Sequence, residues 1–263
     1  MRPIRALHSA VAMYTWLPVR KHDWEDRDFP DGLVAFPWLG AALGAVVGLF
    51  GWGVAWVAEA RWLGVVLALG SAAWITGAMH LDGVADVADG LGSRKPPEHA
   101  RAIMKQSDIG PMGVTTLLLV LLAEAAAIAV LPPQTWPLLL AAGLAAGRVS
   151  ALAGALPRLG EEPVPGTLSG LVAGRVRPAH VWMTRMLVVL AVVAGSWWLL
   201  GWRAAACWAG AIVMAWLLAA GWQRHLLRRL GRLNGDCYGS LIETTQVITW
   251  VLIALTYHRM GVA

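Results

Sequence analysis

Seven long runs of mostly apolar residues dominate the chain and restrict what it can fold into. A membrane-spanning helix needs about 20 such residues. Only helices and closed barrels satisfy their backbone hydrogen bonds within lipid, and runs of this length suit helices. We therefore predict an all-α fold, a polytopic membrane helical bundle of about seven transmembrane helices, with residues 1–263 forming a single integral membrane domain. The runs are residues 33–58, 62–79, 114–131, 137–156, 181–200, 204–221 and 241–257.

The composition supports a membrane protein. Only 14% of the residues are charged and 58% are hydrophobic, whereas soluble domains carry about 25% charged residues. The 16 tryptophans are typical of chains that place aromatic rings at the membrane surface. The first thirty residues lack a long uncharged apolar core, so no cleavable signal peptide is expected. The two cysteines give no sign of a disulfide or a thiolate metal site.

The positive charges orient the predicted spans. With the N-terminus in the cytoplasm, sixteen of the 21 lysines and arginines fall in inside segments, three fall outside and two lie within spans. Cytoplasmic loops of membrane proteins carry this excess of positive charge. We therefore expect a multi-pass protein of the bacterial cytoplasmic (inner) membrane, with its N-terminus and its active site on the cytoplasmic side.

Three aspartates follow the second apolar run in the stretch HLDGVADVADG, which covers residues 80–90. Asp82, Asp86 and Asp89 have the spacing i, i+4 and i+7, which puts them on one face of a helix. Like charges this close repel one another unless a cation lies among them. Carboxylates and substrate phosphates are the ligands that Mg²⁺ prefers. The stripe therefore predicts a magnesium site, whereas an isolated acid would indicate only a solvated helix end.

Other polar residues lie near the same predicted membrane face. Asp108 is a further candidate ligand or base, and Arg101 and Lys105, one helical turn apart, either face a phosphate or form a positive flank. Arg148, with Ser150, lies inside a span, where a charge is costly and usually functional. The last loop and helix entry add Arg232, Asp236 and Glu243, although residues 234–236 also suit a tight turn.

Three segments in this order carry a family resemblance: HLDGVADVADG, IMKQSDIGPMG (residues 103–113) and GRLNGDCYGSLIE (residues 231–243). Together with YTWLPV and FPWLGAALG near the start, they resemble cobalamin synthase, the family of adenosylcobinamide-GDP ribazoletransferase. The resemblance runs from about residue 10 to about residue 255. It implies that the ribose 3′-hydroxyl of α-ribazole, or of its 5′-phosphate, attacks the cobinamide-linked phosphorus of adenosylcobinamide-GDP. GMP leaves, and adenosylcobalamin or its 5′-phosphate forms with Mg²⁺ as cofactor.

The resemblance also implies roles for the candidate residues. The metal ligands would be Asp82, Asp86, Asp89 and Asp236. The catalytic set would be Asp82, Asp86, Asp89 and Asp108, with Asp89 or Asp108 as the base. Asp108 ranks below the stripe because the family pattern has an arginine there. The substrate contacts would be His80, Arg101, Lys105, Arg148, Ser150, Arg232, Asp236 and Glu243, although a lone histidine at the end of a span is more often structural.

The expected partners are adenosylcobinamide-GDP, α-ribazole or its 5′-phosphate, and membrane lipid, without nucleic acid. The sequence leaves open a homo-oligomer or a complex with other cobalamin-assembly enzymes. Two alternatives remain at this stage. A CDP-alcohol-type membrane phosphotransferase also uses an aspartate stripe, but its Ala-Arg signature is missing here. A cation or proton transporter would place its acids on broken helices near the middle of the bilayer, whereas these acids cluster at predicted helix ends.

Overall fold

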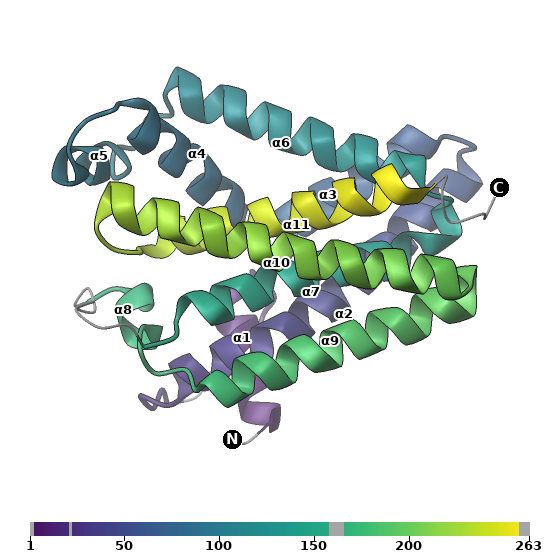
Figure 1. The fold of residues 1–263 in the computed structure, drawn as a ribbon, viewed down its shortest axis with the longest axis horizontal. Helices are drawn as coiled ribbons and strands as arrows, with labels where there is room; N and C mark the ends of the chain where they lie inside the picture. Colours follow the sequence, from purple (N-terminus) through teal and green to yellow (C-terminus); the bar gives the residue numbers. More distant parts are fainter. Residues whose placement is uncertain (1–2, 21–22, 158–165, 258–263) are drawn as a thin grey trace.

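The computed structural model describes residues 3–20, 23–157 and 166–257, and within these ranges helices are the only regular elements (Figure 1). This confirms the predicted all-α fold. The helices are α1 (Pro3–Tyr14), α2 (Asp28–Val57), α3 (Arg61–Ile75), α4 (Met79–Gly92), α5 (Pro97–Ile103), α6 (Pro111–Val130), the 3-10 turn η1 (Pro133–Thr135), α7 (Trp136–Gly154), α8 (Leu168–Val172), α9 (Pro178–Leu200), α10 (Trp202–Leu230) and α11 (Gly235–Tyr257).

Six of the predicted spans are confirmed as helices long and apolar enough to cross a membrane. In the described part of the chain these are α2, α6, α7 together with η1, α9, α10 and α11. The remaining run behaves differently. α3 and α4 are long and apolar enough to cross a membrane only when they are taken together, and the two helices meet at a bend of 88°. The described part of the chain therefore has six candidate spans and one bent helix pair, which is either a broken span or a re-entrant loop.

The prediction of a continuous helix over residues 62–79 is wrong at its end. α3 stops at Ile75, and Gly77 and Ala78 follow with φ angles of 61° and 55°. Two consecutive residues in the left-handed region cannot continue a right-handed helix. The chain consequently turns before His80, and the three aspartates lie on a separate helix rather than at the end of α3.

Glycines on α2 allow its close packing against α7. A Cβ atom on Gly44 would lie 2.5 Å from the carbonyl oxygen of Leu140, and one on Gly48 would lie 2.5 Å from that of Trp136. Neither contact is tolerable, so the two backbones approach closely only because these side chains are absent. Small residues serve the same purpose in many membrane helix pairs.

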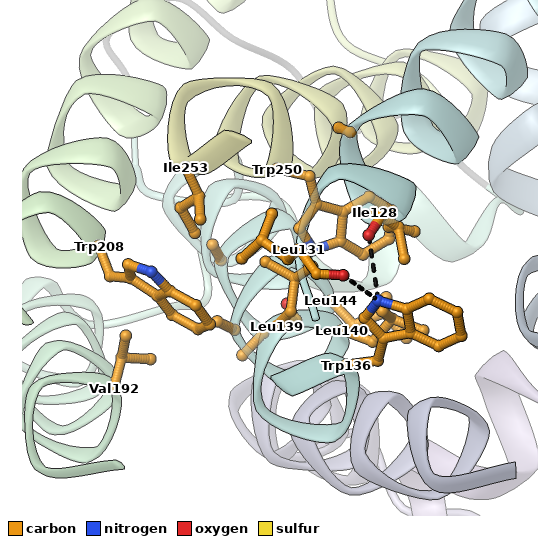
Figure 2. Packing of buried hydrophobic residues seen from close by; sticks show 14 of the residues in the cluster. Ile128, Leu131, Trp136, Leu139, Leu140, Leu144, Val192, Trp208, Trp250 and Ile253 are labelled. Carbon is orange, nitrogen blue, oxygen red and sulfur yellow. Dashed lines mark hydrogen bonds between the residues drawn. The ribbon is translucent and has the colours of Figure 1, made fainter. Parts of the chain in front are cut away.

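Tryptophans occupy both the core and the rim of the bundle. Trp136, Trp208 and Trp250 are fully buried (Figure 2), and the indole N–H of Trp136 donates to the carbonyl groups of Ile128 (3.0 Å) and Leu131 (3.1 Å). Trp250 donates to Leu139 at 2.8 Å. Other tryptophans are exposed and lie at the ends of α2 and α9 and the starts of α3 and α10, where the membrane surface is expected: Trp56, Trp62, Trp198 and Trp202.

The short helices gather at one end of the bundle. Figure 1 places α4, α5 and α8 at the end of the bundle opposite the last turns of α11. The long helix α11 begins at this end and packs against α4, α6, α7 and α10. The sequence segments that carry the candidate residues are brought together there.

Candidate active site

The aspartate stripe lies on the polar face of α4. Val84, Ala85 and Val87 point into the protein, whereas Asp82 is exposed and Asp86 is half-buried. The predicted helical register of the aspartates is confirmed, because α4 is an uninterrupted helix from Met79 to Gly92.

Two glycine contacts bring α4 against the start of α11. A Cβ atom on Gly83 would lie 2.6 Å from the carbonyl oxygen of Asp236, and one on Gly239 would lie 3.2 Å from the Cα of His80. The absence of a side chain at Gly83 therefore lets the backbone of α11 approach α4 closely. As a result Asp236, more than 140 positions further along the chain, lies beside the stripe.

The carboxylates of α4 and α11 form one electrostatic cluster. The negative charges of Asp82, Asp236 and Asp89 all act on the half-buried carboxyl group of Asp86. Acids that repel one another in this way favour binding of a cation among them.

A cavity of about 240 Å³ opens beside this cluster, and we call it the aspartate cavity. Asp82, Asp236 and His80 provide its polar side. Its other side is mostly apolar and comes from α1, α2, α7, α8 and α11. Three of the predicted site residues thus meet around one space.

His80 also borders a second, small cavity of about 30 Å³, which Glu124, Arg148, Glu243 and Gln246 line as well. Its volume is enough for a water molecule. His80 Nδ1 lies 3.8 Å from a carboxylate oxygen of Glu243. These polar side chains form a buried cluster around the small cavity, and His80 separates this cavity from the aspartate cavity.

Gln246 joins the two acids of this buried cluster. Its side-chain amide donates to Glu124 at 2.9 Å and to Glu243 at 2.8 Å. The sequence analysis identified neither Glu124 nor Gln246 as part of a cluster with Glu243. The only available signal was the position of Gln246 one helical turn after Glu243.

Arg148 and Ser150 lie in the interior, not in the aspartate cavity. The Arg148 guanidinium donates to the Leu144 carbonyl at 2.9 Å and lies 5.0 Å from the centre of the Phe36 ring. Its Nε has no hydrogen-bond partner among the described residues. Ser150 donates to the Leu241 carbonyl at 3.1 Å, which links α7 to α11. Both residues therefore support the helices that carry the site.

Asp89 has a structural partner as well as a place in the stripe. Its carboxylate accepts hydrogen bonds from the backbone N–H groups of Gly110 (2.7 Å) and Gly113 (2.8 Å) at the start of α6. Acidic groups stabilise helix N-termini in this way. Asp89 does not line the aspartate cavity.

The remaining candidates, Arg101, Lys105, Asp108 and Arg232, line neither cavity. Arg101 donates to the carbonyl of Leu230 and so joins α5 to the end of α10. The positive charge of Lys105 stabilises the negative charge of the Asp236 carboxylate. Asp108 and Arg232 are exposed in loops and line neither cavity. The acids Glu161 and Glu162, and the basic residues Arg2, Lys21, Arg158 and Arg259 counted for orientation, lie outside the described residues.

The acidic cluster provides the donor type that Mg²⁺ prefers. In the ranges that the structure describes, no three His, Cys, Asp or Glu side chains converge closely enough to form a metal site by themselves. Mg²⁺ is usually held by one or two carboxylates together with substrate phosphates. The residues therefore fit a magnesium ion that a phosphate-bearing substrate helps to bind.

The sequence analysis missed the apolar side of the aspartate cavity. This side includes Tyr14, Phe36, Leu168 and Val172, which come from three separate helices. Tyr14 and Phe36 begin two of the segments that carry the family resemblance, but nothing in those segments assigned their side chains to a cavity. Only the packing of α1, α2 and α8 makes these residues neighbours.

A multi-pass helical bundle with a carboxylate-lined cavity at one end defines an integral membrane protein with a candidate active site. The sequence model of the cobalamin-5-phosphate synthase family matches residues 6–254. The chain therefore belongs to this family of cobalamin biosynthesis, and it is a transferase.

Relatives of similar length support the assignment. A protein of Brevibacillus brevis named adenosylcobinamide-GDP ribazoletransferase is 31% identical over 253 residues, which cover 95% of this chain and 98% of the relative. A protein of Ralstonia pickettii with the same name is 30% identical and covers 95% of each chain. One of Laribacter hongkongensis is 35% identical over 72% of each chain. No solved structure matches the fold.

Proposed function

We propose that the protein transfers the adenosylcobinamide-phosphate group of adenosylcobinamide-GDP to the ribose 3′-hydroxyl of α-ribazole or α-ribazole 5′-phosphate. The products are adenosylcobalamin, or its 5′-phosphate, and GMP. The observation that carries this proposal is the meeting of Asp82 and Asp236 around one cavity, beside Asp86. The names of the relatives supply the substrates.

The residues of the cavity suit a displacement at phosphorus. The 3′-hydroxyl oxygen forms a bond to the cobinamide-linked phosphorus, and the bond from this phosphorus to the GMP oxygen breaks. The hydroxyl proton passes to a carboxylate that lines the cavity. Asp89 and Asp108, the two bases expected from the sequence, do not line it, because Asp89 holds α6 and Asp108 is exposed.

Two of the three carboxylates Asp82, Asp86 and Asp236 would hold Mg²⁺ together with the donor phosphates, which leaves one carboxylate free to accept the hydroxyl proton. The ion would neutralise the charge that develops on the phosphate oxygens and on the leaving GMP. Asp89 extends the same stripe and positions α6 next to it. Lys105, whose charge already acts on Asp236, lies where it can attract the polyphosphate of the donor.

We also propose that the aspartate cavity faces the cytoplasm of a bacterial cell. The loops at its end of the bundle carry the excess of positive charge, whereas Arg61 and Arg203 lie at the starts of α3 and α10, at the other end. Both substrates are large and polar, and a cavity on the cytoplasmic side gives them direct access.

A mass-spectrometric turnover assay tests the function. Membranes containing the protein receive adenosylcobinamide-GDP, α-ribazole or its 5′-phosphate, and Mg²⁺. We expect GMP and a cobalamin product in equal amounts, and at least a hundredfold lower rate for Asp82→Asn. The control is Glu98→Gln, an exposed acid on α5 outside the cavity, which should keep the wild-type rate. Absence of product from well-folded wild-type protein with either acceptor would contradict the proposal.

A further inference from the structure

The aspartate cavity has two chemically different sides. Asp82, Asp236 and His80 form the polar side. Most of the remaining lining is apolar or aromatic, although Ser169 and Tyr238 also belong to it. We call its apolar and aromatic members from four helices the apolar wall: Tyr14, Leu33, Phe36, Leu168, Val172 and Ile242. A cavity divided in this way is suited to a ligand with one apolar and one polar half.

Two stacked aromatic rings contribute to the apolar wall. The rings of Tyr14 on α1 and Phe36 on α2 stack with centroids 3.8 Å apart and an interplanar angle of 20°. The ring of Phe36 also lies 5.8 Å from that of His80, at the border with the polar side. Burial raises the pKa of the Tyr14 phenol, which therefore stays uncharged. An uncharged aromatic and aliphatic lining of this kind favours an aromatic ligand over a charged one.

The volume of the cavity restricts which substrate can enter. Cavities that enclose drug-sized molecules measure roughly 300–1,000 Å³, and the aspartate cavity measures about 240 Å³. It is too small for a corrinoid ring with its side chains, so the donor has to approach from outside. A bicyclic base with part of its ribose is of the right size.

We propose that the apolar wall is the binding site for the aromatic base of the acceptor nucleoside, which is the benzimidazole of α-ribazole. This inference rests on the proposed function. With the base against Phe36 and Val172, the attached ribose extends towards Asp82 and Asp236, where its 3′-hydroxyl is needed. The donor phosphates then meet the ribose at the open side of the cavity.

The wall also selects among bases. A benzimidazole with methyl substituents leaves few polar groups to satisfy. A purine with an amino group would bring polar atoms against Leu33 and Val172, and buried polar groups without partners are costly. The apolar wall therefore favours acceptors with apolar bases over acceptors with polar ones.

Equilibrium binding of α-ribazole to the full-length protein in detergent, measured by titration calorimetry without donor, tests the site directly. We expect Leu168→Asn and Val172→Thr each to weaken binding about tenfold. Leu17→Asn is the matched control, because Leu17 is similarly exposed (46%, against 40% for Leu168) and does not line the cavity. Free 5,6-dimethylbenzimidazole should compete with α-ribazole for the wild-type protein.

Turnover measured with the same variants separates this inference from the proposed function. The KM for α-ribazole should rise about tenfold, whereas the KM for adenosylcobinamide-GDP should stay within about twofold. If both variants turn over substrate and bind α-ribazole as tightly as the wild-type protein, the base site is wrong but the proposed function stands. The same conclusion follows if the variants raise only the KM for adenosylcobinamide-GDP. Binding that the variants weaken, without any turnover by wild-type protein, would overturn the proposed function and leave the site standing. A folded wild-type protein that does not bind α-ribazole would overturn the site.

Discussion

The carboxylate of Asp89 on α4 accepts a hydrogen bond of 2.8 Å from the backbone N–H of Gly113, in the first turn of α6. A second bond of 2.7 Å comes from Gly110. The first N–H groups of a helix have no partner within the helix. Asp89 therefore caps the N-terminus of α6, so the stripe that contributes to the candidate active site also positions a neighbouring helix.

Replacing Asp89 should reduce stability, whereas replacing Asp82 should not. Asp89→Ala leaves two backbone N–H groups without their charged acceptor, at a cost of about 2–3 kcal/mol. Asp82 is exposed, and Asp82→Asn should change the unfolding free energy by less than about 0.5 kcal/mol. Thermal unfolding of the purified proteins, followed by tryptophan fluorescence, measures both. Equal melting temperatures for the two variants would contradict the role of Asp89 as a helix cap.

Gly83→Ala should separate α4 from α11. The added Cβ would lie 2.6 Å from the carbonyl oxygen of Asp236, so one helix has to move. We expect turnover to fall at least tenfold, because Asp236 moves away from the stripe. Gly70→Ala on α3 is the control, since its Cβ would meet nothing within 4 Å. Wild-type turnover in Gly83→Ala would show that the site does not depend on this contact.

Gln246→Leu should destabilise the protein through the buried acids. The amide of Gln246 donates to both Glu124 and Glu243, and leucine removes both bonds. Buried acceptors without donors cost roughly 1–3 kcal/mol. The melting temperature should fall, and the double variant Gln246→Leu, Glu124→Leu should recover part of the loss. A larger loss in the double variant would contradict this account.

Removal of Mg²⁺ should stop turnover reversibly. Treatment with EDTA should abolish product formation, and added Mg²⁺ should restore it. Asp236→Asn should raise the Mg²⁺ concentration needed for half-maximal rate at least tenfold, since ligand carboxylates bind the ion more strongly than amides do. Glu98→Gln should leave that concentration unchanged. Full activity in EDTA, or an unchanged Mg²⁺ requirement in Asp236→Asn, would exclude Asp236 as a ligand.

Cysteine labelling should establish the orientation in the membrane. Lys95→Cys, in the loop after α4, should react with an impermeant maleimide only in inside-out vesicles. Gln134→Cys, in η1 at the other end, should react only in right-side-out vesicles. The parent protein should carry Cys207→Ala, because Cys207 is a partly exposed free thiol. The reverse pattern would place the aspartate cavity outside the cytoplasm.

The membrane class and most of the helices follow from the sequence alone. Apolar runs of about 20 residues have few stable alternatives to a spanning helix in lipid, and six of the seven predicted runs are such helices. The register of Asp82, Asp86 and Asp89 could also be predicted, because a spacing of i, i+4 and i+7 puts side chains on one helix face in any α-helix. The break after Ile75 was missed because it depends on two left-handed residues, one of them an alanine.

The tertiary structure alone decided which candidates meet. Asp82, Asp236 and Arg148 could be recognised from the sequence, because charged residues are unusual in or beside a membrane whatever the tertiary structure is. Their partners depended on helix packing: Gly83 lets Asp236 approach the stripe, whereas Arg148 lies behind it beside Phe36. The apolar wall around Phe36 and Leu168 is likewise a product of packing, since apolar side chains carry no signal that separates a ligand surface from a core. Sequence patterns report the environment of each helix, and contacts between helices distant in the chain are determined by how their surfaces fit together.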